Sequence, residues 1–319
     1  MTTILFSPPL PPSIMDMARA MLPPGYELLA ADSKAPEFAR ALPETEFWMG
    51  FARGGLNEEF FRTGKKLKLV QLISAGYDAI DLAAAGRSGV PVCNNGGSNS
   101  VSVAEHTLML ILSVLKRVVW CHANVNAGKW RVGGFDHMVL HELEGKTVGI
   151  VGLGRIGKKV ARRLHGFDAR VQYYDIARLT EHEEDALGVR FVLFEELLRT
   201  SDIVTVHVPL TETTRTLMST NEFALMKPGA IFINTCRGPV VDEAALHKAI
   251  TSGHLGGAGL DVMVEEPPET NHPLFGAENV IITPHMAGPT WENWPKAFRN
   301  AIDNIQRVAA GRPPLWVVS

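Results

Sequence analysis

The chain has 319 residues, of which 46% are hydrophobic and 20% charged, and its net charge is −3. This composition is that of an ordinary globular protein with room for two domains, and it does not favour binding to nucleic acid or to an anionic membrane. The three cysteines are scattered without CxxC spacing, so neither a disulfide framework nor a zinc site is indicated. We therefore expect no bound metal. Since no signal peptide is evident after Met1, we also expect a cytoplasmic protein.

The first part of the chain alternates short apolar runs with helical segments. The runs occupy residues 3–6, 26–30, 47–50, 67–72 and 90–93. Such alternation predicts an α/β layer with a parallel sheet. The segment SAGYD (74–78) follows the fourth run, at the end of a strand, where sheets of this kind bind ligands. Taken alone, it is equally compatible with a carboxylate-binding loop and with an ordinary glycine turn.

A polar, glycine-rich segment at residues 94–100 is the candidate domain boundary. It leads into an apolar stretch that predicts one long helix over residues 101–126, buried between domains. His106 lies within this helix and is better interpreted as a hydrogen-bonded core histidine than as a catalytic group. Trp130, just after the helix, can pack internally or at an interface.

The centre of the chain carries a nucleotide-binding pattern. A β-branched run at 147–151 precedes glycines at G-x-G-x-x-G spacing, Gly152, Gly154 and Gly157, and then a basic amphipathic helix and a second strand that ends at Asp175. The glycines permit a tight turn, close approach to a pyrophosphate and close packing of helix on strand, while the acid accepts ribose hydroxyls. Together with the N–H groups of the helix start, these residues predict a dinucleotide-binding domain.

Three chemically active residues follow later strands. The acidic segment 181–185 is most simply a solvated surface, but Arg237, Glu266 and His285 fall at or just beyond predicted strand ends. The carboxyl ends of parallel strands share one sheet edge, so these residues should meet on the edge where Asp175 lies. Singly they suit a surface or a turn; together with a nucleotide fold they favour a shared catalytic cleft.

Seven motifs make the sequence resemble the D-isomer-specific 2-hydroxyacid dehydrogenases over nearly the whole chain. They are SAGYD (74–78), VAEHTLMLIL (103–112), VGLGRIG (151–157), HVPLTETT (207–214), NTCRGPVVDEAAL (234–246), GAGLDVMVEEPP (257–268) and NVIITPHMAG (279–288). The resemblance implies an α/β protein of two Rossmann-like domains with the active site in the cleft between them. A flavodoxin-like substrate domain would comprise residues 1–98 and 289–319, and an NAD-binding Rossmann domain residues 99–288.

The activity implied by the resemblance is that of an NAD(P)-dependent oxidoreductase (EC 1.1.1.-). It would interconvert a 2-oxo acid and a D-2-hydroxy acid by hydride transfer, as glyoxylate and hydroxypyruvate reductases do. Arg237 would bind the substrate carboxylate and polarise the keto oxygen, His285 would be the acid/base, and Glu266 its carboxylate partner. The chemistry agrees, because reduction places negative charge on the carbonyl oxygen and a guanidinium binds a carboxylate through two hydrogen bonds. A nearby carboxylate favours an imidazolium and orients the ring.

The resemblance also implies substrate and cofactor contacts. The substrate residues would be Ser74, Ala75, Gly76, Arg237 and His285. The cofactor residues would be Gly152, Gly154, Arg155, Ile156, Gly157, Asp175, His207, Pro209, Thr214, Thr235, Cys236, Arg237, Asp261, His285, Ala287 and Gly288. Asp175 would repel a 2′-phosphate, so NAD(H) is expected to be preferred. The nearby Arg178 could accommodate that phosphate, so NADP(H) is not excluded.

Two positions differ from related dehydrogenases and narrow the expected activity within the family. Glu266 stands where formate dehydrogenases of this superfamily carry glutamine, and Ala75 where phosphite dehydrogenases carry lysine, so both activities are disfavoured. Trp291 and Trp294 either favour a bulkier 2-oxo acid or pack the hinge, and packing is the preferred interpretation.

The resemblance further implies a homodimer of nucleotide domains. The contacts would come from residues 101–126 and 127–141, with Trp130 and Phe135 as apolar anchors. The alternative to an enzyme is an NAD(H)-responsive corepressor-type protein, since such relatives keep the whole catalytic set. The absence of basic patches and long disordered tails argues against that alternative.

Overall fold

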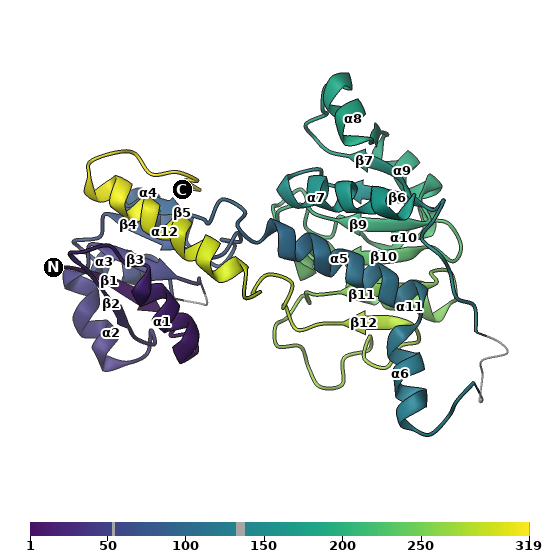
Figure 1. Ribbon diagram of the computed structural model, residues 1–319, viewed down its shortest axis with the longest axis horizontal. Coiled ribbons are helices and arrows are strands. Elements are labelled where there is room, and N and C mark those ends of the chain that lie inside the picture. Colours follow the sequence, from purple (N-terminus) through teal and green to yellow (C-terminus); the bar gives the residue numbers. More distant parts are fainter. Residues whose placement is uncertain (53–54, 132–137, 319) are drawn as a thin grey trace. The chain divides into compact units, whose positions relative to one another are not determined.

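The computed structural model describes residues 1–52, 55–131 and 138–318. Its internal contacts divide the chain into two units, one made of Met1–Asn99 with Pro289–Ser319 and the other of Ser100–Gly288. Each unit is an α/β structure with its own parallel sheet (Figure 1). The α/β class with two Rossmann-like sheets is therefore confirmed.

The first unit contains a five-stranded sheet in the order β2-β1-β3-β4-β5. The strands are β1 (Thr2–Ser7), β2 (Tyr26–Ala30), β3 (Phe47–Gly50), β4 (Leu69–Leu72) and β5 (Val92–Cys93). The helices are α1 (Pro12–Ala20), α2 (Pro36–Ala41), α3 (Glu58–Thr63), α4 (Leu82–Ser88) and the C-terminal α12 (Asn293–Ala309). β3 and β4 are fully buried, and apart from Gln71 in β4 they contain no polar side chain, because helices cover both faces of a parallel sheet.

The C-terminal helix α12 belongs to this first unit, where it packs on β4 and α1 (Figure 1). Trp294, in its first turn, is buried; it stacks on Phe298 at 6.0 Å between ring centroids and meets Phe51 edge-on at 6.3 Å. Trp291 is instead exposed. Trp294 is thus a packing residue of this unit.

The second unit contains a seven-stranded sheet in the order β12-β11-β10-β9-β6-β7-β8. The strands are β6 (Thr147–Val151), β7 (Arg170–Tyr174), β8 (Arg190–Phe191), β9 (Ile203–Val206), β10 (Ile231–Asn234), β11 (Gly257–Leu260) and β12 (Val280–Ile282). The strand order reverses between β6 and β9, and ligands of such sheets bind at this switch point, beyond the carboxyl ends of the strands.

Helices cover both faces of this second sheet (Figure 1). One face carries α5 (Ser100–Leu115), α7 (Arg155–Leu164) and α8 (Glu181–Leu187); the other carries α9 (Phe194–Thr200), α10 (Thr220–Leu225) and α11 (Glu243–Thr251). A further helix, α6 (Val118–Asn126), follows α5.

The prediction of one buried helix over residues 101–126 is wrong. The chain bends by 63° between α5 and α6, and Arg117 adopts a left-handed conformation with φ of 47°. Apolar α5 packs against β10, β11 and β12, whereas α6 has no buried residue, because the chain has left the sheet that α5 covers. In the described part of the chain, no single helix meets the length and hydropathy needed to cross a membrane; α5 and α6 do so only as this bent pair.

The acidic segment 181–185 is also more than a solvated surface. It forms the first turns of α8, which begins with a capping box between Thr180 and Glu183. Glu184 is buried, and its carboxylate accepts hydrogen bonds from the Tyr173 hydroxyl and the Arg178 guanidinium, both at 3.0 Å. Buried carboxylates of this kind are stable only when paired, and the partner Tyr173 comes from β7.

Candidate active site

The glycine turn joins β6 to α7 with the geometry that a dinucleotide needs. Gly152 has φ of 92°, and a Cβ there would lie 2.7 Å from the His207 carbonyl oxygen. A Cβ on Gly157 would lie 2.3 Å from the carbonyl oxygen of Gly152, so α7 can pack close to the turn only with glycine at this position. A Cβ on Gly154, in contrast, would meet nothing within 4 Å, which leaves its backbone open to a ligand.

The start of α7 and the carboxylate of Asp175 face this turn. The ten-residue helix has no side-chain cap at Gly154, so its first N–H groups can bind an anion. Asp175 follows β7, and its carboxylate accepts hydrogen bonds from the N–H groups of Leu153 at 2.7 Å and Ala177 at 2.9 Å. An open glycine, an uncapped helix start and an acid tied to the turn fit a nicotinamide dinucleotide.

Arg178, the residue that could accommodate the 2′-phosphate of NADP(H), contacts Glu184 and Phe191 in the structure. Its guanidinium donates to the buried Glu184 and lies 5.0 Å from the centre of the Phe191 ring. The hydrogen bond and charge of Glu184 raise the pKa of Arg178. The hydrogen bonds from Arg178 and Tyr173 and the charge of Arg178 lower the pKa of Glu184, despite the opposing effect of burial. This pairing ties the guanidinium to Glu184 of α8.

His285 and Glu266 form a hydrogen-bonded pair. His285 follows β12, and its Nδ1 lies 2.7 Å from Oε2 of Glu266, whose other oxygen accepts the Met263 N–H at 3.1 Å. Burial tends to raise the pKa of Glu266, but the bonds from His285 and Met263 and the charges of His285 and Arg237 lower it below its usual value. Glu266 is therefore a carboxylate that orients the imidazole ring through Nδ1.

Arg237 is placed by the turn after β10. Asn234, almost fully buried, accepts the Cys236 N–H at 2.9 Å and donates to the Arg237 carbonyl at 2.9 Å, while the Arg237 guanidinium donates to the Cys236 carbonyl at 2.6 Å. Next in the chain, Gly238 contacts the backbone of Met263. This contact joins the arginine turn to the segment that carries Glu266, and the effect of the Arg237 charge on the pKa of Glu266 follows from it.

Several other predicted cofactor residues lie in the same unit. Burial lowers the pKa of His207 to about 3, so its ring is neutral. Its Nε2 lies 3.0 Å from the Thr205 hydroxyl, and its buried Nδ1 has no hydrogen-bond partner among the residues that the structure describes. Thr235 and Cys236 are buried, and Thr214 donates to the Pro209 carbonyl at 2.6 Å. An unsatisfied buried ring nitrogen is a further feature that suits a ligand.

The segment Ser74–Gly76 follows β4 in the first unit. Its carbonyl groups are hydrogen-bonded within that unit: Ser74 accepts from the Asn95 N–H at 3.0 Å, Ala75 from the Asn94 amide at 3.1 Å, and Gly76 from the Ser74 hydroxyl at 2.9 Å. These bonds fix the orientation of the peptide groups in the loop.

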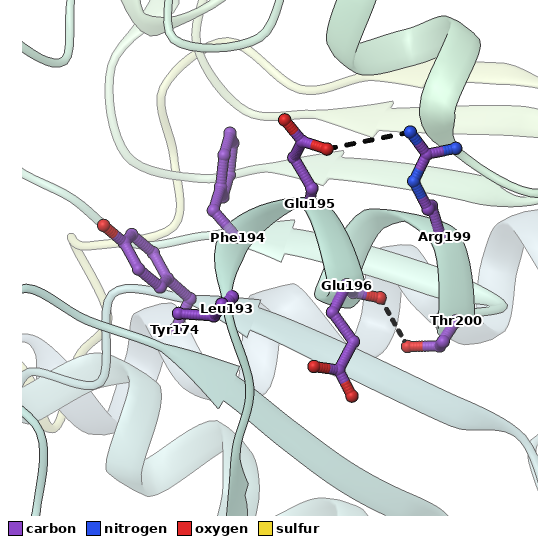
Figure 2. Close-up of a pocket in the computed structure, with 7 residues that line it drawn as sticks. All are labelled: Tyr174, Leu193, Phe194, Glu195, Glu196, Arg199 and Thr200. Atoms are coloured by element: carbon purple, nitrogen blue, oxygen red, sulfur yellow. Dashed lines mark hydrogen bonds and ion pairs between the residues drawn. The ribbon is translucent and has the colours of Figure 1, made fainter.

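The second unit also carries a shallow groove that is lined by a different set of residues (Figure 2). Tyr174, Leu193 and Phe194 form its apolar wall, and Glu195 pairs with Arg199 across one turn of α9. None of the predicted site residues lines it, so the groove carries no assignment.

The sequence pattern did not identify the residues that orient this site. Gly238 and Asn234 lie within a recognised motif, yet their roles depend on contacts with Met263 and with the turn after β10. Glu243, at the start of α11, accepts the Val264 N–H at 2.8 Å and pairs with His272 at 3.2 Å, and these two contacts anchor the loop on both sides of Glu266. An acid in the first turn of a helix was the one available signal, and it is too common to indicate such a role.

The sheet order, the glycine turn and a histidine–carboxylate pair near an arginine define a nicotinamide-dependent dehydrogenase. The family model for the D-isomer specific 2-hydroxyacid dehydrogenase NAD binding domain matches residues 108–287. A glyoxylate reductase from Thermococcus litoralis is 40% identical over 297 residues, 91% of this chain and 89% of the relative. Another from Korarchaeum cryptofilum is 39% identical over 260 residues, 81% of this chain and 78% of the relative.

Solved structures agree with the sequence comparison. The D-mandelate dehydrogenase of Rhodotorula graminis superposes with a TM-score of 0.87 at 30% identity, over 100% of this chain and 98% of that chain. The chain belongs to the D-isomer specific 2-hydroxyacid dehydrogenase family. It is an NAD-dependent oxidoreductase that interconverts a 2-oxo acid and a D-2-hydroxy acid, which confirms the fold, the reaction class and the cofactor expected from the motifs.

Proposed function

We propose that the protein reduces a small 2-oxo acid such as glyoxylate or hydroxypyruvate with NADH. The observation that carries the proposal is the 2.7 Å contact between His285 Nδ1 and Glu266 Oε2, beside the turn of Arg237. A proton donor and a fixed positive charge are the two groups that a carbonyl needs when it accepts a hydride. The names of the most similar relatives support glyoxylate as the first substrate to test.

Each residue then has one task. Arg237 binds the carboxylate of the 2-oxo acid and polarises its keto oxygen, because the guanidinium can donate to both. Nε2 of His285 donates a proton to that oxygen during reduction and accepts it back during oxidation. Glu266 holds the ring through Nδ1 and stabilises its positive charge. The bound nicotinamide supplies the hydride.

The loop Ser74–Gly76 is proposed to donate its N–H groups to the substrate carboxylate. Its carbonyl groups are already bonded within the first unit, which is consistent with N–H groups available to a ligand. The first unit is accordingly proposed to be the substrate-binding domain and the second the NAD-binding domain.

NADH is proposed to be preferred over NADPH. Asp175 accepts the N–H groups of Leu153 and Ala177, and its carboxylate would bind ribose hydroxyls and repel a 2′-phosphate. Arg178 is tied to Glu184 and Phe191. The remaining proposed cofactor contacts are those of the sequence analysis, from Gly152–Gly157 to Ala287 and Gly288.

A homodimer is proposed on the exposed apolar side chains of α6. Val118, Val119 and Val125 are each about half exposed, and Trp130, just beyond the helix, is 75% exposed. Apolar side chains gathered on one helix of a globular unit suit a partner surface. The second expected anchor, Phe135, lies outside the described residues. Light scattering tests this proposal. We expect the mass of a dimer for the wild type and the mass of a monomer for Val119→Glu.

Steady-state kinetics with a panel of 2-oxo acids and both reduced cofactors tests the proposed activity. We expect turnover of glyoxylate or hydroxypyruvate with NADH and a lower kcat/KM with NADPH and with bulky acids such as benzoylformate, the 2-oxo acid that corresponds to mandelate. NADH binding without turnover of any member would instead favour the corepressor-type alternative. A cytoplasmic location belongs to the same proposal and is tested by cell fractionation.

A further inference from the structure

The backbone of His285 is held in an unfavourable conformation. Its φ is 55°, in the left-handed region that residues with a Cβ rarely adopt and that costs about 1 kcal/mol or more. Such a conformation persists only where surrounding contacts over-determine it. What holds this loop therefore decides where the imidazole of His285 points.

Asp261 supplies these contacts. It follows β11 and is buried, with 1% exposed. Its backbone carbonyl accepts the His285 N–H at 2.8 Å, its Oδ1 accepts the Met286 N–H at 2.9 Å, and its Oδ2 accepts the Ala287 N–H at 2.8 Å. One residue thus binds three consecutive N–H groups of the histidine loop.

The carboxylate of Asp261 is held in turn by Thr283 and by His106 of α5. The Thr283 hydroxyl lies 2.5 Å from Asp261 Oδ1, and His106 Nε2 lies 2.9 Å from the Thr283 hydroxyl and 3.3 Å from Oδ1. Because the single hydroxyl hydrogen points to the carboxylate, the hydroxyl oxygen accepts from His106, and Nε2 must carry the hydrogen. One turn earlier on α5, Ser102 donates to the Gly288 carbonyl at 3.0 Å, at the other end of the loop.

We propose that His106 is a positioning residue for the catalytic loop: through Thr283 and Asp261 it fixes the strained backbone that aims His285. This inference rests on the proposed role of His285 as the acid/base. It gives a task to a histidine that the sequence pattern left among core residues. Burial tends to raise the pKa of Asp261, but the bonds from His106, Thr283, Met286 and Ala287 lower it, so the carboxylate keeps the charge that binds the loop.

Two nearly equal substitutions at His106 test the proposal. The amide nitrogen of glutamine can occupy the place of Nε2, whereas that of asparagine cannot reach it. We expect His106→Gln to retain kcat within about threefold and His106→Asn to lose about tenfold or more, since small displacements of a proton donor are costly. The dissociation constant for NADH, measured by fluorescence, should change little in either variant. Exposed His182→Gln, on α8, is the control.

The pH profile separates positioning from simple destabilisation. In His106→Asn the pKa of Asp261 should rise, because a hydrogen bond that lowers it is lost. Protonation of Asp261 would then release the loop, so the variant should lose rate in 2-oxo acid reduction on the acid side of the profile, where the wild type does not. Equal kcat and equal acid limbs in the Gln and Asn variants would overturn the proposal.

A measurement without turnover makes the proposal independent of the substrate. The amide proton shifts of Met286 and Ala287 report their bonds to the carboxylate, and we expect them to move upfield in His106→Asn and in Thr283→Val but not in His106→Gln. If the wild type reduces no 2-oxo acid, the proposed function fails while these shifts still test the positioning. Unchanged shifts in both His106→Asn and Thr283→Val would contradict it.

Discussion

Gly238 lies directly against the backbone of Met263: a Cβ on Gly238 would fall 1.9 Å from both the carbonyl carbon and the carbonyl oxygen of Met263. This contact presses the turn of Arg237 onto the segment whose N–H binds Glu266. Arg237 and Glu266 are thus linked through two backbone segments in contact, and only glycine permits the approach.

Gly238→Ala should therefore separate Arg237 from the catalytic pair. Because the clash is with backbone, we expect a loss of stability of about 2 kcal/mol or more and a large fall in kcat/KM for the 2-oxo acid. Thermal unfolding and steady-state kinetics measure both effects. Gly166→Ala is the control, since a Cβ there meets nothing within 4 Å. Wild-type kinetics in Gly238→Ala would show that the contact is dispensable.

Glu266→Gln should move the alkaline limb of the pH–rate profile for 2-oxo acid reduction and the acid limb for hydroxy acid oxidation in the same direction. The amide cannot stabilise an imidazolium as a carboxylate does, so the proton that reduction requires on His285 is lost at lower pH, and the alkaline limb of the reduction profile moves to lower pH. Oxidation of the hydroxy acid requires the neutral ring, so its acid limb should fall equally. The measurement is a pair of pH–rate profiles, with exposed Glu265→Gln as the matched control. Unmoved limbs would exclude the pairing as the source of the histidine's charge.

Arg237→Lys should behave differently from Glu266→Gln. A point charge replaces two parallel donors, so KM should rise and kcat fall with little movement of either limb of the pH–rate profile.

His285→Ala should remove most turnover and leave NADH binding nearly unchanged, because the dinucleotide elements lie at Gly152–Gly157 and Asp175. Kinetics and NADH fluorescence titration give both results. Loss of NADH affinity in His285→Ala would contradict this division of tasks.

Asp175→Ala should weaken the preference for NADH. The variant loses the acceptor for the ribose hydroxyls and the charge that repels a 2′-phosphate, so we expect the ratio of kcat/KM for NADPH to that for NADH to rise on the order of tenfold. Arg178→Leu should leave the ratio near that of the wild type, since this guanidinium is bound to Glu184. A strong fall in NADPH use in Arg178→Leu would mean that the arginine leaves Glu184 to bind the phosphate.

The three thiols should react at very different rates. Burial raises the pKa of Cys93 and of Cys236 to about 11, so at neutral pH both are buried thiols with almost no thiolate. Cys121, on α6, is partly exposed. A thiol-reactive dye should label one site quickly in the native protein and two more only after unfolding, and Cys121→Ser should remove the fast phase. Fast labelling of Cys236 would require that the turn of Arg237 opens readily.

The sequence alone determined the elements whose signals are local. The strand, glycine turn, helix and acid from Lys146 to Asp175 appear where the pattern predicts them, because periodicity and glycine spacing act over a few residues. The strand ends that carry Arg237, Glu266 and His285 were found in the same way. The roles of these residues, and the division of tasks between the two units, stay predictions.

Only the tertiary structure decided which distant groups meet. The burial of Glu184 on α8 depends on Tyr173 of β7. The position of the loop that carries His285 depends on Asp261, Thr283 and His106. Each of these contacts joins residues from separate elements, so no local pattern encodes it. Gly238 likewise looks like an ordinary turn glycine until Met263 is placed against it.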